Sequence, residues 1–318
     1  MVWAISIPAS TANLGPGFDS IGIALDKYLE VDVEIATEWQ IDNLSNNLPD
    51  VPNPQDHLIV QAAQKTAQMY GMSLPPCHLE VKSEIPLARG MGSSASAIVA
   101  GVELANQVLN LQLTSHDKLK VATIMEGHPD NAAASIFGGF TISSGGEDGE
   151  IHIFHTYQID ASFVLFIPNF ELKTEKARNV LPESYTRKVA AQASATSNLL
   201  IAAFLSQSFE QAGTYMEQDL FHEPYRLDLI PESRDIKIAA KKAGAFGTCI
   251  SGAGPTLLSL IQKGTEEVFI SNLNELFPNF ELVPVKMNRT GIVVSKKKNA
   301  SDLISPDEQM FFHKEVVL

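Results

Sequence analysis

The sequence is most informative at Pro86-Leu87-Ala88-Arg89-Gly90-Met91-Gly92-Ser93-Ser94-Ala95-Ser96, where two glycines precede a run of small residues. Apolar residues then recur at helical spacing up to about Asn110, so this stretch predicts a loop that leads into a helix. Glycines let the backbone approach a ligand closely, and the first helical turn offers unpaired N–H groups and a positive dipole end. A phosphate group is the natural ligand of such a loop. The hydroxyl of Ser93 or Ser94 could also reach a phosphate oxygen or Mg²⁺.

Other interpretations of this glycine-rich stretch stay open. A tight turn with a serine N-cap would use the same residue types. The spacing Gly90-x-Gly92-x-x-Ala95 also matches a dinucleotide-binding fingerprint, but that motif follows its strand directly, and here residues 86–89 intervene. The sequence has no G-x-x-x-x-G-K-[ST] motif, which excludes a Walker-type phosphate loop.

Composition narrows the class of protein further. The 318 residues are 45% apolar and 19% charged, which is enough to build a substantial core and excludes a disordered or fibrous chain. The net charge of −14 argues against binding to nucleic acid or to an anionic membrane surface. The two cysteines, Cys77 and Cys249, form neither a disulfide framework nor a metal motif, and no signal peptide or membrane-spanning segment is evident. We therefore expect a cytoplasmic protein.

Hydrophobic patterning predicts two α+β domains, at residues 1–158 and 159–318. Strands are expected at residues 31–35, 77–82, 162–168, 246–250, 256–261 and 281–286, and helices at residues 57–70, 93–110, 115–126, 187–213, 235–242 and 265–277. A turn is expected at Gly145-Gly146-Glu147-Asp148-Gly149, while residues 296–318 form a tail without a clear pattern.

Two further loops carry candidate polar residues. The first, residues 8–20, follows the first strand and contains Asn13 and Asp19, although both could simply form Asx turns. The second, residues 246–256, lies between two expected strands and contains Ser251-Gly252-Ala253-Gly254-Pro255-Thr256, for which a glycine-rich hairpin bend is the alternative.

Charged candidates follow in three more places. Glu126-Gly127-His128-Pro129-Asp130-Asn131 gathers polar side chains at a helix end, and Glu126 is the expected oxygen ligand if Mg²⁺ is bound. His128 could bind a ligand or cap the helix. Thr174 and Arg178 would share a helix face, and Arg226 follows later in the chain. Arginines suit recognition of a carboxylate, although an exposed arginine is more often only solvated.

Taken together, these motifs resemble those of the GHMP kinases, and the resemblance covers nearly the whole chain. Pro86 to Ala95 corresponds to the family motif P-x-x-x-G-L-G-S-S-A, with Met91 in place of the usual leucine. Residues 8–19 and 251–256 correspond to the family's first and last motifs. Within the family, the motifs at residues 8–19, 126–131 and 223–226 are similar to those of the branch that acts on L-homoserine.

The resemblance implies a fold, a reaction and partners. It implies an N-terminal domain like the second domain of a small-subunit ribosomal protein, and a C-terminal ferredoxin-like domain. It implies that ATP, with Mg²⁺, phosphorylates the hydroxyl of L-homoserine to O-phospho-L-homoserine on the route to threonine, in an enzyme that is commonly a homodimer.

The resemblance also implies roles for individual residues. Residues 86–96 would bind the ATP phosphates, and Ser94 and Glu126 would position Mg²⁺. The substrate would lie against Asn13, Asp19, His128, Arg178, Arg226, Ser251 and Gly252. The catalytic set would be Glu126, Asp130, Asn131 and Thr174. Asp130 is a candidate base, although a loose transition state needs no dedicated base.

Two alternatives remain for the function. Another small-molecule kinase of the family, for example a mevalonate-type enzyme, would bind a substrate without an ammonium group and leave Asp19 without a cationic partner. A catalytically silent ligand sensor would be expected to have lost phosphate-binding or magnesium-binding groups, whereas Ser93, Ser94 and Glu126 are all present.

Overall fold

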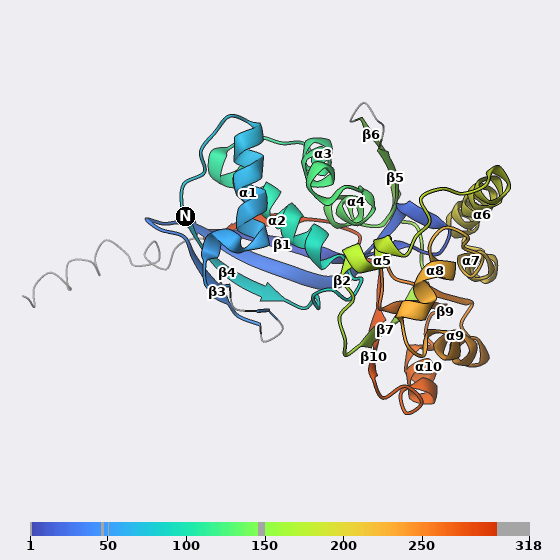
Figure 1. The fold of residues 1–318 in the computed structure, drawn as a ribbon. Coiled ribbons are helices and arrows are strands. Elements are labelled where there is room, and N and C mark those ends of the chain that lie inside the picture. Colours follow the sequence, from blue (N-terminus) through green and yellow to red (C-terminus); the bar gives the residue numbers. More distant parts are fainter. Residues whose placement is uncertain (1, 46–47, 50, 146–149, 298–318) are drawn as a thin grey trace, which may run out of the picture.

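The structure is a computed structural model, and it describes residues 2–45, 48–49, 51–145 and 150–297. Two sheets organise these residues, one in each half of the molecule (Figure 1). In the described residues no helix is long and apolar enough to span a bilayer. The predicted turn at 145–149 falls almost entirely outside the described part of the chain.

The first sheet has seven strands. Its main path runs β11-β1-β2-β4-β3, while β5 pairs with β2 and β6 pairs with β5. The strands are β1 (Val2–Asn13), β2 (Gly17–Ile35), β3 (Gln40–Asn43), β4 (Cys77–Ser83), β5 (Phe140–Gly145), β6 (Ile151–Thr156) and β11 (Val293–Lys297). All pairs are antiparallel except β3 with β4. Alternation along β4 buries Cys77, Leu79 and Val81, which confirms the predicted strand.

Four helices cover one face of the first sheet (Figure 1). They are α1 (Leu58–Met69), α2 (Ser93–Leu109), α3 (Ser115–Glu126) and α4 (Asp130–Phe137). The helix α3 begins with a capping box between Thr114 and Asp117 and ends at Gly127 in the left-handed conformation, which explains its predicted limits. The ends of α2, α3 and α4 lie around the site described below.

The second sheet has four antiparallel strands in the order β10-β7-β9-β8. The strands are β7 (Ser162–Pro168), β8 (Gly247–Ile250), β9 (Leu257–Ile261) and β10 (Phe280–Val285). Along the chain this order is fourth, first, third, second, which is the arrangement of a ferredoxin-like domain and confirms that expectation. The remaining helices are α5 (Thr174–Asn179), α6 (Arg187–Leu205), α7 (Phe209–Met216), α8 (Glu223–Arg226), α9 (Ser233–Lys242) and α10 (Glu266–Leu273), with short 3₁₀ turns at Pro54–Asp56 and Leu227–Leu229.

The predicted long helix over residues 187–213 is wrong, because the chain breaks it into α6 and α7. Gln207 adopts a left-handed backbone (φ +57°), which ends the first helix. The turn lets Gly213 pack directly on the chain at Phe246, where a Cβ atom would lie 2.1 Å from the Phe246 carbonyl carbon. Close packing of two backbones therefore decides this break, and helical periodicity did not reveal it.

The predicted loop at residues 8–20 is also wrong in part. Strand β1 continues to Asn13 and β2 begins at Gly17, so only Leu14–Pro16 forms the turn. Residues 8–13 are buried, and their mostly small side chains leave room for α4 and for the glycine loop at Gly252. The two candidate residues of this segment, Asn13 and Asp19, consequently stand on strands at either side of a tight turn.

The expected domain boundary near residue 158 falls between β6 of the first sheet and β7 of the second. Strand β11 then returns to the first sheet and pairs with β1 through residues 293–297. The sequence showed no pattern for this strand, and its last two residues lie in the expected tail. The rest of that tail, residues 298–318, is outside the described residues.

Candidate active site

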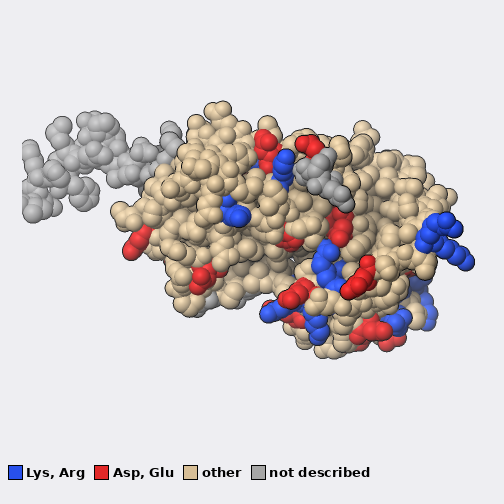
Figure 2. Space-filling model, turned by 45° about the horizontal axis from the view of Figure 1, so that its top comes forward, with Lys and Arg blue, Asp and Glu red and all other residues tan. Residues whose placement is uncertain are grey.

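A polar cleft of about 550 Å³ brings the predicted site residues together between the two halves. Most of the sequence-predicted residues line it: Asn13, Asp19, Ala88, Gly90, Gly92, Ser93, Ser94, Glu126, His128, Asp130, Asn131, Thr174, Arg178, Arg226 and Gly252. The face in Figure 2 carries interspersed acidic and basic side chains and no extended basic patch. Both acidic and basic side chains line the cleft, which suits a small polar molecule.

The other predicted residues do not line the cleft: Pro86, Leu87, Arg89, Met91, Ala95, Ser96 and Ser251. Of these, Leu87 and Ser96 line the adjoining cavity described below. Met91, Ala95 and Ser251 are buried. The Ser251 hydroxyl oxygen lies 2.7 Å from the carbonyl oxygen of Gly90, which joins the two glycine loops. The guanidinium of Arg89 donates to carbonyl oxygens of Leu87, Pro168 and Asn169. These contacts hold the glycine loop in place.

The N-terminal end of α2 forms one wall of the cleft. Gly92 is its N-cap, in the left-handed conformation (φ +70°), and no side chain caps this end. The alternative of a serine N-cap is therefore wrong. The first N–H groups of α2 are therefore available to donate hydrogen bonds to a ligand, and the helix dipole favours an anion at this end.

Glycine is required at this helix end for steric reasons. A Cβ atom on Gly92 would lie 2.1 Å from the Ser10 hydroxyl oxygen, and one on Gly90 would lie 2.3 Å from the Ser251 carbonyl oxygen. Both glycines also have positive φ angles. The loop that the sequence predicts to bind phosphate thus has a backbone conformation that only glycine at these two positions allows.

The hydroxyl of Ser94 donates to the Glu126 carboxylate at 2.9 Å, so the predicted magnesium ligands meet at the ends of α2 and α3. Burial raises the pKa of Glu126, and the Ser94 hydrogen bond opposes this effect. In the described chain no lysine, arginine or histidine lies within 4.0 Å of the Glu126 carboxylate. A hydroxyl beside a carboxylate that forms no direct ion pair with a described cation is an oxygen donor set that fits Mg²⁺.

Asp19 and Arg178 form a two-point ion pair across the cleft, at 2.6 and 3.1 Å. The Asn13 side chain accepts from the Asp19 N–H and donates to the carbonyl oxygen of Gly252. The contact with Asp19 spans six residues, so it is not an Asx turn, and Asn13 and Asp19 both line the cleft. Thr174 and Arg178 both belong to α5, as their spacing predicted.

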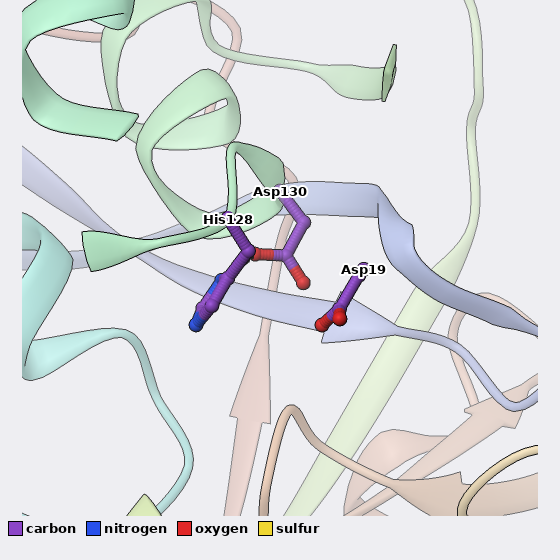
Figure 3. Close-up of side chains that lie close together, drawn as sticks. All are labelled: Asp19, His128 and Asp130. Atoms are coloured by element: carbon purple, nitrogen blue, oxygen red, sulfur yellow. Dashed lines mark hydrogen bonds and ion pairs between the residues drawn. The ribbon is translucent and has the colours of Figure 1, made fainter. Parts of the chain in front are cut away.

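His128 and Asp130 form a second pair, with Nδ1 of the imidazole 2.6 Å from a carboxylate oxygen. Figure 3 shows both side chains beside Asp19, and donor atoms of all three lie within 4.8 Å of one another. Burial lowers the pKa of His128, but the hydrogen bond and the charge of Asp130 outweigh burial and leave the pKa above its usual value. The pair therefore favours a protonated, cationic imidazole.

One oxygen of the Asp130 carboxylate, Oδ1, accepts several hydrogen bonds. Asp130 is 2% exposed, and this oxygen also accepts from the N–H of Asn131 at 2.7 Å. The side chain of Asn131 in turn accepts from the Ser10 hydroxyl at 3.0 Å. These hydrogen bonds fix the N-terminal end of α4 against β1.

Arg226 is the most deeply buried cation of the cleft, with 1% exposure. Its guanidinium donates to the carbonyl oxygens of Ala177 and Gly252, and burial lowers its pKa to about 10. Among the described residues no carboxylate lies within 4.0 Å of it. A buried guanidinium without an acidic partner is suited to the carboxylate of a ligand.

An apolar cavity of about 900 Å³ adjoins the polar cleft, and sequence reasoning missed it. The two share Ala88, Ser93 and Ser94. Its apolar lining includes Leu29, Leu48, Val81, Ile85 and Leu87, which come from separate segments of the chain. No local spacing in the sequence links these residues. The one available signal for the cavity was the presence of apolar residues around positions 48–51, in the segment before α1.

Comparisons with known proteins agree with this geometry. Residues 57–139 match the N-terminal domain model of the GHMP kinases, and residues 200–279 match the C-terminal one. Homoserine kinase from Bacillus velezensis is 47% identical over 93% of this chain and 96% of its own length. Homoserine kinase from Oceanobacillus iheyensis is 48% identical over 92% and 99%.

A solved structure assigned to a homoserine kinase from Listeria monocytogenes superposes with a TM-score of 0.81. It is 35% identical and covers 93% of this chain and 100% of its own. The two-domain α+β fold that the resemblance implied is therefore confirmed. Both domain models, the near-complete coverage and the level of identity lead to one assignment: the chain belongs to the homoserine kinase branch of the GHMP kinase family.

Proposed function

We propose that this protein transfers the γ-phosphoryl group of ATP to the hydroxyl of L-homoserine, giving O-phospho-L-homoserine and ADP for threonine biosynthesis. ATP is the phosphate donor of GHMP kinases. One observation carries the proposal: a single cleft gathers the uncapped end of α2, Asp19, Arg178 and Arg226, and among the described residues Arg226 has no carboxylate within 4.0 Å. That combination suits a polyphosphate on one side and a zwitterion on the other.

The nucleotide fits the two adjoining cavities. The apolar cavity would take the base, and the N–H groups of Ser93 and Ser94 would bind the phosphates at the cavity's border with the cleft. Ser94 and Glu126 would hold Mg²⁺, which would offset the negative charge of the phosphates. These two residues thus orient the donor.

The acceptor fits the charged side of the cleft. The Asp19 carboxylate would pair with the ammonium group of homoserine, and Arg178 and Arg226 would bind its carboxylate. Thr174, His128 and Asn131 would surround the reacting hydroxyl. A cationic His128 beside the transferred group would also stabilise the charge that develops there.

In the reaction the hydroxyl oxygen forms a bond to the γ-phosphorus, and the bond between that phosphorus and the bridging oxygen breaks, so that ADP leaves with the electron pair. The hydroxyl proton passes to an oxygen of the transferred phosphoryl group or to water. Because the transition state is loose, that proton can leave late and no strong base is required. The Asp130 carboxylate already binds His128 and the Asn131 N–H, so these contacts favour a role in holding His128. The role of Asp130 as a base stays a prediction.

Among the alternatives, a mevalonate-type kinase would leave Asp19 with Arg178 as its partner. The mevalonate carboxylate could still bind Arg226, so only the ammonium group of the acceptor distinguishes the two substrates at this site. A silent sensor is disfavoured because Ser94 and Glu126 are in hydrogen-bonding contact. A homodimer in the cytoplasm is part of this proposal, and light scattering on the purified chain would measure its oligomeric state.

The proposal is tested by measuring ADP release with L-homoserine, mevalonate, galactose and shikimate at saturating ATP and Mg²⁺. We expect release above the acceptor-free rate with L-homoserine, and a new phosphate monoester in the ³¹P NMR spectrum of the product. Release with mevalonate and none with L-homoserine would overturn the proposal.

A further inference from the structure

His222 lies at the junction between the two halves of the active site, and nothing in the proposed reaction has yet used it. It is fully buried and precedes α8, four residues before Arg226. The imidazole stacks on the Phe18 ring, with the two centroids 5.3 Å apart. The guanidinium carbon of Arg226 also lies 5.3 Å from the centroid of the Phe18 ring. Phe18 directly precedes Asp19, so His222 contacts elements of both halves.

The hydrogen-bond partners of His222 fix its tautomer. Its Nδ1 lies 3.2 Å from Nη1 of Arg226, and a guanidinium can only donate. Its Nε2 lies 2.9 Å from the carbonyl oxygen of Gly15 and 3.5 Å from a carboxylate oxygen of Asp219, and both can only accept. The proton must therefore sit on Nε2, with Nδ1 as the acceptor for Arg226. Burial, which lowers the pKa of His222, agrees with a neutral ring.

The Gly15 carbonyl group that accepts from His222 belongs to a rigid turn. Gly15 stands in the turn between β1 and β2 with φ +79°, and a Cβ atom there would lie 2.1 Å from the carbonyl oxygen of Met216. The Asp219 carboxylate accepts from the N–H groups of Phe221, His222 and Glu223, which fixes the backbone at the other end. The imidazole is thus clamped from two sides and presents one lone pair to Arg226.

Arg226 needs such a partner because it is buried and no carboxylate in the described part of the chain lies close enough to orient it. Its Nε donates to Ala177 and its Nη1 is shared between Gly252 and His222. A neutral acceptor can hold the guanidinium without neutralising its charge, whereas an acidic residue in the same place would compete with the carboxylate of the ligand.

We infer that His222 is a positioning residue for substrate binding: as the neutral Nε2–H tautomer it holds the Arg226 guanidinium in the orientation that receives the carboxylate of the amino-acid substrate. This inference rests on the proposed function. It assigns His222 no contact with the substrate and no part in phosphoryl transfer.

Two isosteric variants separate the roles of the two ring nitrogens. In His222→Asn the amide oxygen can stand near the place of Nδ1 and accept from Arg226, whereas in His222→Gln the amide reaches the place of Nε2 and keeps the contact to Gly15. We expect His222→Gln to raise the KM for L-homoserine about tenfold or more, as the loss of a hydrogen bond to a charged group does. The KM for ATP and kcat should stay within about twofold, and His222→Asn should restore the KM for L-homoserine to within about threefold of the wild type.

A matched ligand tests whether the effect passes through the carboxylate. The inhibition constant of 3-aminopropan-1-ol, which is homoserine without its carboxylate, should be the same in the wild type and in both variants. An equal loss of affinity for this amino alcohol, or an unchanged KM for L-homoserine in His222→Gln, would overturn the inference. If the wild type does not phosphorylate L-homoserine at all, the proposed function fails instead.

The tautomer can be measured without any variant or substrate. In ¹⁵N-labelled wild-type protein, long-range ¹H–¹⁵N correlation spectra should show His222 with an unprotonated Nδ1 and a protonated Nε2 at neutral pH. A proton on Nδ1, or a doubly protonated ring, would contradict the inference even if both variants failed to fold.

Discussion

The two sides of the cleft recognise charge by different means. The phosphate side is built from the backbone, with the uncapped end of α2 held in place by Gly90 and Gly92 and with Ser94 and Glu126 beside it. The acceptor side is built from charged side chains that come from distant parts of the sequence. We therefore expect phosphate binding to be lost when a side chain is added at one of the glycines. We expect acceptor binding to be lost when the charge or the hydrogen-bond donors of a side chain are changed.

The largest effect is expected from Gly92→Ala, because the new Cβ would collide with Ser10 and keep a strained φ angle. We expect turnover with ATP to fall by about a thousandfold as the loop and the first turn of α2 shift. Gly71→Ala is the control, since Gly71 also has a positive φ but no atom within 4 Å of the added Cβ. Equal losses of kcat/KM in both variants would show that backbone strain alone matters.

The next effect is expected from Glu126→Gln, which removes the carboxylate charge of the Ser94 pair but keeps its shape. We expect kcat to fall by about a hundredfold and the Mg²⁺ concentration for half-maximal rate to rise. Glu267→Gln, on the exposed surface of α10, should change neither quantity. An unchanged Mg²⁺ requirement in Glu126→Gln would remove this residue from the proposed metal site.

A smaller effect is expected on the acceptor side from Arg226→Lys. Lysine keeps the charge but cannot reproduce the three-point contact to Ala177, Gly252 and His222. We expect the KM for L-homoserine to rise about thirtyfold with little change in the KM for ATP. Arg234→Lys, at an exposed ion pair on α9, is the matched control. A parallel rise of both KM values would contradict a separate acceptor side.

The smallest effect concerns the charge of His128. Because Asp130 raises its pKa against the effect of burial, Asp130→Asn should shift that pKa from above to below its usual value. The raised pKa also means that the pair stabilises the fold at low pH and loses this contribution as the pH rises through the folded-state pKa. An NMR titration of His128 in both proteins measures the shift, and an unchanged pKa would show that Asp130 does not set the charge.

The same difference between the two sides explains what the sequence could reveal. The phosphate side lies within residues 86–96, so glycine spacing and helical periodicity were enough to predict it. On the acceptor side, Asp19 and Arg178 meet only because β2 and α5 fold together. No spacing links them, and the resemblance to a family supplied their roles.

The remaining errors have the same origin in contacts between distant segments. The short strand β11 is mostly exposed and pairs with β1 at the opposite end of the sequence, so alternation was too weak to reveal it. The break before α7 and the extension of β1 to Asn13 depend on packing against Phe246 and Gly252. Hydrophobic periodicity predicts a helix or strand that has one face in the core and one face in water. It misses an element whose limits depend on contact with one particular distant segment.

The most direct test of the account is a crystal structure with a non-hydrolysable ATP analogue and L-homoserine. We expect the terminal phosphates at the N–H groups of Ser93 and Ser94, the base in the apolar cavity, and the homoserine carboxylate against Arg178 and Arg226. A triphosphate bound elsewhere, with the end of α2 free of it, would contradict the account.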